Sequence, residues 1–141
     1  VDVVFFPRVL HNLARFQDEG KGDFLDAALA DVYAALKPGG TFGVVQHHAR
    51  DEMSDEFSNG SHGYLKKDFV IAALEGAGFE FVAESDINAN PADQPGEDDV
   101  VWRLPPSYVG TRDDPEAKAR VDAIGESNRM TLLFRMASQA G

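Results

Sequence analysis

The sequence contains no cysteine, and this absence excludes several chemistries at once. Disulfide bonds, thiolate zinc sites and cysteine nucleophiles all need a thiol. The chain also lacks an apolar run near the roughly 20 residues that a helix needs to cross a membrane. The strand pattern begins at the first residue, with no basic stretch before an apolar segment as in a signal peptide, so we expect an upstream portion to be missing. The composition is that of one soluble domain, with 43% hydrophobic and 26% charged residues among 141.

Positive charge is scarce. Lys and Arg total 13 against 24 Asp and Glu, which gives a formal net charge of −11 at pH 7. Such a surface repels the phosphate backbone of nucleic acids and the headgroups of anionic membranes. The charge therefore predicts no nucleic-acid partner and no membrane partner.

The first third of the chain has a strand–helix–strand pattern. The apolar run Val1–Phe6 has the length and the β-branched content of a strand buried on both faces, and Pro7 ends it. The residues Val9–Phe16 have the spacing of one or two helical turns. Apolar residues then recur at steps of three and four over Asp23–Leu36, which predicts an amphipathic helix. The apolar run Thr41–Val45 follows, so a βαβ unit with a parallel strand pair is expected.

The remainder predicts another helix, two further strands and an irregular insert. Residues 46–63 form a polar segment that is too long for a simple connector and is predicted to be a functional loop or lid. A helix is expected over Leu65–Ala77, with Phe69 on its apolar face, and a strand over Phe79–Ser85. The alternating run Met130–Met136 predicts an edge or antiparallel strand.

The insert spans about residues 86–128 and contains five of the seven prolines. One helix is expected inside it, over Pro115–Ile124, because proline is favoured in the first helical turn. No internal repeat or domain linker is found.

Five short sequence motifs resemble those of one protein family and occur in the same order along the chain. The motifs are LHNL at Leu10–Leu13, ALKPGGTFGVVQH at Ala35–His47, ALEGAGFEFVAES at Ala73–Ser85, NANPAD at Asn88–Asp93 and IGESNRMTLLFR at Ile124–Arg135. Together they resemble the second half of class I (Rossmann-like) S-adenosylmethionine-dependent methyltransferases, in particular a subgroup described only as predicted methyltransferases. The ordered set covers nearly the whole chain and is more specific than any one motif.

The resemblance implies an α/β fold: a partial doubly wound, mostly parallel sheet whose last strand is antiparallel and lies beside the family's fifth strand. It implies S-adenosyl-L-methionine as cofactor of the complete protein and a small-molecule methyl acceptor. The family's glycine-rich cofactor loop and ribose-binding acid are not found, because Gly39, Gly40 and Gly43 precede a strand and predict a turn. Residues 1–141 are therefore expected to form a single incomplete domain, the C-terminal half of a methyltransferase, that is inactive alone.

Ligands of open parallel sheets bind beyond the carboxyl ends of the strands. At the first such end, the resemblance implies that Phe6, Pro7, His11 and Asn12 border the cofactor and that His11 acts near the transferred methyl group. The alternative is that His11 caps or packs against the following short helix.

At the second end, His47 is the catalytic candidate, as a base or as a residue that orients the acceptor. This chain has Gln46 where the family usually has Asp, which removes a carboxylate that could orient a histidine. Adjacent side chains diverge on extended backbone, so His48 is expected in the solvated loop instead. The histidines, including His62, lack the spacing of a helical metal motif, so no metal site is predicted.

The predicted acceptor site uses residues further along the chain. Tyr64, Asn88, Asn90 and Trp102 are the candidates for substrate binding. The alternatives are that Tyr64 packs at the start of the helix and that Trp102 anchors the irregular segment to the sheet.

Two other functions remain open. A non-catalytic module could self-associate as a homodimer through the edge of Val3–Phe6, because an unpaired strand edge can pair with another copy. A nicotinamide-dependent oxidoreductase could also use a doubly wound sheet. The Lys37-Pro-Gly-Gly turn and the late antiparallel strand favour the methyltransferase.

Overall fold

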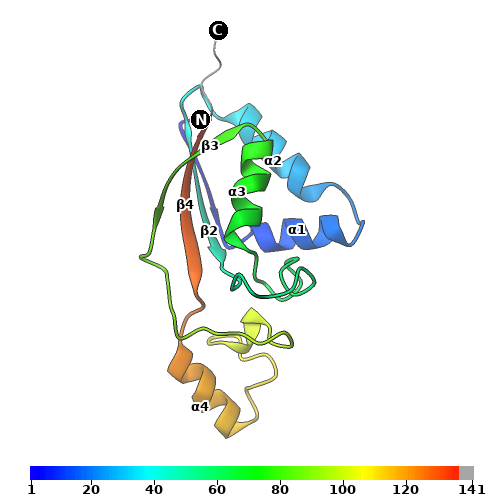
Figure 1. The fold of residues 1–141 in the computed structure, drawn as a ribbon, viewed down its shortest axis with the longest axis vertical. Helices are drawn as coiled ribbons and strands as arrows, with labels where there is room; N and C mark the ends of the chain where they lie inside the picture. The colour runs from blue at the N-terminus through cyan, green and yellow to red at the C-terminus, as the bar shows by residue number, and fades with distance from the viewer. Residues whose placement is uncertain (137–141) are drawn as a thin grey trace.

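Four strands form one sheet in the order β1-β2-β4-β3 in a computed structural model that describes residues 1–136 (Figure 1). Residues 137–141, the end of the predicted domain, lie outside the described residues. The strands are β1 (Val3–Pro7), β2 (Thr41–His47), β3 (Phe79–Ser85) and β4 (Arg129–Met136). Each of the predicted strands is present, with ends shifted by one or two residues.

The last strand lies between two others. β1 pairs with β2 in parallel, and β4 is antiparallel to both β2 and β3. β1, β2 and β3 therefore run in the same direction, and β4 runs against them. The position of the antiparallel strand beside β2 is the one that the family resemblance implied. The description "mostly parallel" holds for strand direction, whereas only the β1–β2 contact is a parallel pair.

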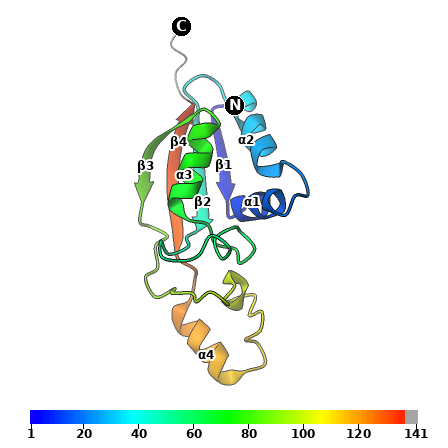
Figure 2. The ribbon, with the colours of Figure 1, turned by 45° about the vertical axis from the view of Figure 1, so that its right-hand side comes forward.

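Helices α1 (Leu10–Asp18), α2 (Phe24–Ala35) and α3 (Lys67–Gly76) lie against one face of the sheet (Figures 1 and 2). The core forms between them and is made of fully buried side chains, among them Leu29, Phe42, Leu74 and Phe134. The predicted apolar stripe of α2 thus faces the sheet. None of the helices within residues 1–136 is both long enough and apolar enough to cross a membrane.

Two expectations about burial are wrong. β1 is not buried on both faces, because the side chains of Val3 and Phe5 are 63% and 58% exposed. β1 lies at the edge of the sheet, and the helices cover only the face to which Val4 and Phe6 point. Phe69 is 45% exposed as well, since α3 turns Val70 rather than Phe69 toward the sheet.

The segment 48–66 and the insert pack together into a second, smaller core. Its buried members include Met53, Phe57, Tyr64, Val101 and Leu104. The predicted helix inside the insert is present as α4 (Pro115–Ile124), and the Asp114 carboxylate caps its first turn. The polar segment after β2 is therefore packed against the insert rather than free.

Two glycines bring the segment after β2 against its neighbours. Gly60 has φ +98°, and a Cβ there would lie 2.2 Å from the carbonyl oxygen of His11. Gly63 has φ +89°, and a Cβ there would lie 2.2 Å from the side chain of Val101. Only glycine combines this backbone conformation with such close contact. The segment thereby supports both α1 and the short 3₁₀ turn Val101–Arg103.

Candidate functional site

A cleft of about 380 Å³ lies at the carboxyl ends of β1 and β2. Its lining comes from the β1–α1 connection, the end of β2 and the insert, and consists of Pro7, Arg8, His11, Asn12, His47, Val101, Trp102, Pro105, Pro106 and Ser107. Five predicted site residues thus meet in one place: Pro7, His11, Asn12, His47 and Trp102. This is the edge of a parallel strand pair where ligands of open α/β sheets bind.

Three aromatic rings stand close together in the cleft. The ring of His11 lies 5.5 Å from that of His47 and 5.9 Å from that of Trp102, measured between centroids. The turn before α1 makes this possible, because Arg8 has φ 60°, an uncommon conformation for a residue with a Cβ. This conformation turns the chain directly from β1 into α1, so His11 in the first helical turn lies beside the end of β2.

The fully buried side chain of Gln46 holds His11. Its Nε2 donates to the carbonyl oxygens of Gly63 and His47, at 3.0 and 3.3 Å, so its Oε1 must face His11. Oε1 accepts from the backbone N–H of His11 at 3.2 Å and lies 3.3 Å from ring atom Nδ1. Because a carboxamide oxygen can only accept, this contact is a hydrogen bond when His11 carries its proton on Nδ1. Nε2 of His11 is then the ring atom with a free lone pair.

His47 is oriented by a different residue. Its Nδ1 lies 2.5 Å from Oγ of Ser127, just before β4. Burial, with smaller contributions from the neighbouring His11, Arg129 and Arg8, lowers the pKa of His47 to about 3. Burial also lowers the pKa of His11. Both imidazoles are therefore neutral near pH 7, and His47 is better suited to accept a hydrogen bond than to remove a proton.

The other predicted site residues do not line the cleft. Phe6 points into the core, where its ring packs edge-on against Phe42 at 5.0 Å. The amide of Asn88 donates to the hydroxyl of Thr131, and the amide of Asn90 donates to the carbonyl oxygens of Ile124, the last residue of α4, and Glu126. Asn88 ties the insert to β4, whereas Asn90 joins the beginning of the insert to its end.

Tyr64 lies behind the cleft in a buried ion-pair cluster. Its hydroxyl donates to Asp93 at 2.8 Å and accepts from Arg103 at 2.9 Å, and Arg103 pairs with Asp93 at 2.8 Å. The Asp93 side chain is fully buried and also accepts from the backbone N–H of Asn128. Burial and the negative charge of Asp93 raise the pKa of Tyr64. Tyr64 therefore supports the insert rather than closing over the cleft.

Sequence reasoning missed Arg8, Gln46 and Ser127 as parts of the site. The sequence indicates only the loss of a carboxylate at Gln46, whereas in the structure its amide orients His11. The contact of Ser127 with His47 joins residues 80 positions apart. The sequence contained one indication of Arg8 and Gln46 as site residues, since both lie at the carboxyl ends of parallel strands.

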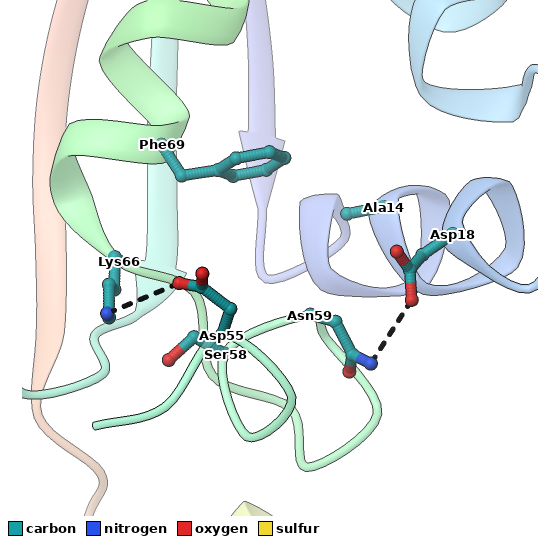
Figure 3. A pocket seen from close by; sticks show the side chains of 7 residues that line it. All are labelled: Ala14, Asp18, Asp55, Ser58, Asn59, Lys66 and Phe69. Atoms are coloured by element: carbon teal, nitrogen blue, oxygen red, sulfur yellow. Dashed lines mark hydrogen bonds and ion pairs between the residues drawn. The ribbon is translucent and has the colours of Figure 1, made fainter.

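A second pocket lies between α1, the segment after β2 and the start of α3 (Figure 3). Four of its polar side chains form two pairs: Lys66 lies 3.6 Å from Asp55, and Asn59 donates to Asp18 at 3.2 Å. The buried Oγ of Ser58 has no hydrogen-bond partner among the described residues. None of the predicted site residues lines it. In the part of the chain that is described, no three histidine or acidic side chains are grouped to hold a metal ion.

Comparison with known proteins points to methyltransferases. The chain is 30% identical over 119 residues to the sterol 24-C-methyltransferase of Debaryomyces hansenii, covering 73% of this chain and 30% of that protein. It is 25% identical over 125 residues to the sterol 24-C-methyltransferase of Yarrowia lipolytica, covering 77% and 31%. The chain thus spans about a third of the length of these relatives. No model of a known protein family matches it.

Among solved structures, the [4+2]-cyclase SpnF is similar, with a TM-score of 0.54 over 97% of this chain and 50% of that one. At 17% identity this likeness concerns the fold alone. This likeness, the antiparallel β4 between β2 and β3, and the sequence similarity to methyltransferases agree on one class of fold. The chain has the class I S-adenosylmethionine-dependent methyltransferase fold, as the sequence motifs predicted.

The buried ion pair gives a test of what holds the insert in place. We expect Asp93→Asn to lower the free energy of unfolding by about 3–5 kcal/mol, because it leaves the guanidinium of Arg103 buried without its anion. Glu52→Gln is the control, because it removes an ion pair with Arg50 in which the Glu52 side chain is 67% exposed. We expect it to lower the free energy of unfolding by only about 0–1 kcal/mol. Urea unfolding followed by tryptophan fluorescence measures both. Equal effects of the two variants would contradict this role.

The low pKa of His47 predicts how stability depends on pH. In the unfolded chain a histidine binds a proton near pH 6.5, whereas folded His47 does so near pH 3. The unfolded state therefore holds more protons between these values, and stability falls as the pH drops from 6.5 toward 3. We expect His47→Gln to reduce this slope by up to about 1.4 kcal/mol per pH unit in urea unfolding. An unchanged slope would show that His47 is not held neutral.

Proposed function

We propose that this chain forms the C-terminal part of the catalytic domain of a methyltransferase that uses S-adenosyl-L-methionine to methylate a small-molecule acceptor. The observation that carries the proposal is the cleft beyond β1 and β2, in which His11, Asn12, His47 and Trp102 meet. The sterol methyltransferases that the chain resembles support the reaction.

The side chains of the cleft fit the sulfonium end of this cofactor. S-adenosylmethionine supplies a methyl group on a positively charged sulfur that is already a good leaving group, so alignment matters more than acid–base catalysis. Neutral imidazoles do not repel such a cation, and the aromatic ring of Trp102 can attract one. His11, held by Gln46, offers a fixed lone pair to an acceptor that loses a proton.

Residues 1–136 lack a glycine-rich turn between a strand and a helix, the element that would hold the nucleotide. We therefore assign the adenosine end of the cofactor to a part of the protein outside this chain. On this view the chain alone binds the cofactor weakly and is inactive.

Trp102 is the only tryptophan and lines the cleft, so its fluorescence reports directly on binding. We expect S-adenosylhomocysteine to change this fluorescence saturably in a protein that contains the strand-to-helix glycine loop, and only weakly in residues 1–141. Asn12→Ala should weaken binding in the longer protein, while the surface variant Arg120→Gln should not. Tight stoichiometric binding by the 141-residue chain would contradict the proposed division, and absence of binding by both would contradict the function.

A second candidate function is self-association through β1. Val3 and Phe5 are exposed on a strand that has a neighbour on one side only, and such an edge can pair with another copy. On this reading the chain is a non-catalytic assembly module and forms a homodimer.

Light scattering tests this candidate. If β1 forms the junction, Phe5→Lys should turn a dimer into a monomer, because a charged side chain blocks edge pairing. Val82→Lys is the matched control, since Val82 is 45% exposed on β3 at the other edge of the sheet. A monomer at high concentration in the unmodified chain would exclude this function.

A further inference from the structure

A small cavity of about 100 Å³ adjoins the cleft on the side of β4. Its polar lining consists of Arg8, His47, Glu126, Ser127 and Arg129. The rest is apolar and comes from the insert. Arg8 and His47 line both spaces, so a ligand in the cleft can extend into this cavity.

The positive charge of this cavity is only partly balanced. The side chain of Arg129 is 14% exposed, whereas its ion-pair partner Glu126 is 80% exposed and lies largely in water. The Nε of Arg129 is buried and has no hydrogen-bond partner among the described residues. A buried donor without a partner is costly, so a ligand that accepts from it would be stabilised.

Arg8 adds a second guanidinium. No ion pair or hydrogen bond of its side chain is found within residues 1–136, although the chain as a whole has a net charge of −11. Arg8 and Arg129 also contribute to the low pKa of His47, after burial and His11, which agrees with a locally positive potential. The two guanidiniums form a donor set that suits a carboxylate or a phosphate.

We propose that this cavity binds an anionic group, a carboxylate or phosphate, on the methyl acceptor, with Arg8 and Arg129 as its specificity-determining residues. The inference rests on the proposed function and narrows its acceptor class. The anionic group occupies the small cavity, and the remainder of the acceptor lies in the cleft beside His11 and Trp102. Such an acceptor differs from a sterol, on which the named relatives act.

Benzoate and its neutral isostere benzamide are suitable probes, titrated without cofactor at constant ionic strength and followed by Trp102 fluorescence. Inorganic phosphate is titrated in a separate experiment. We expect benzoate or phosphate to bind saturably. Benzamide should bind at least about tenfold more weakly than benzoate. Arg8→Gln and Arg129→Gln should each weaken anion binding by about ten- to hundredfold, the value of a charged hydrogen bond. Arg120→Gln, an exposed arginine on α4 that does not line the cavity, should leave binding unchanged.

Circular dichroism verifies the fold of each variant, and Arg129→Lys, which retains the charge, should keep part of the affinity. Equal binding of benzoate and benzamide, no saturable anion binding, or an equal loss in Arg120→Gln would each overturn the proposal. Competition between benzoate and S-adenosylhomocysteine in a cofactor-binding form would assign the site to the cofactor's own carboxylate, and this too would overturn it. Because the anion titrations contain no cofactor, their failure is distinguishable from failure of the methyltransferase proposal.

Discussion

The buried carboxylate of Asp93 fixes the geometry of the site. It receives hydrogen bonds from Tyr64, from Arg103 and from the backbone of Asn128, which belong to three segments far apart in the sequence. A carboxylate buried this deeply is stable only when its partners are all in place. Satisfying Asp93 therefore fixes the insert over the ends of the strands. The short turn that contains Arg103 also contains Trp102, so the same interaction sets the wall of the cleft opposite His11.

The aromatic rings of the cleft are neutral, whereas Arg8, which lines both the cleft and the side cavity, and Arg129 carry positive charge. The rings of His11, His47 and Trp102 are uncharged near pH 7, which suits a sulfonium. The side cavity presents Arg8 and Arg129, which would disfavour a nearby cation by themselves. An anionic acceptor would offset these guanidiniums, and the space next to the imidazoles would then be close to neutral. The acceptor proposed for the cavity thus makes the cofactor proposed for the cleft more favourable.

Periodicity and turn chemistry were enough to predict the elements of the fold. The steps of three and four in α2 and the proline that opens α4 predicted both helices to within a residue or two. The rule that ligands bind at the carboxyl ends of parallel strands selected His11 and His47 as candidates, and their rings lie 5.5 Å apart. Neither source of information describes side-chain partners far apart in the sequence. The contact of Ser127 with His47 and the cluster around Asp93 depend on how the insert folds back, and its sequence has no period from which to predict that path.

The role of Gln46 also depends on side-chain partners that are far apart in the sequence. From the sequence, an amide in place of an acid is the loss of an orienting group. In the folded chain the amide uses both ends, accepting from His11 and donating to two carbonyls, so it orients the ring without adding charge. A carboxylate at this buried position would favour the protonated imidazole and place a cation where the proposed sulfonium lies. An amide therefore gives this cleft a fixed and neutral histidine, which suits a reaction that depends on alignment more than on proton transfer.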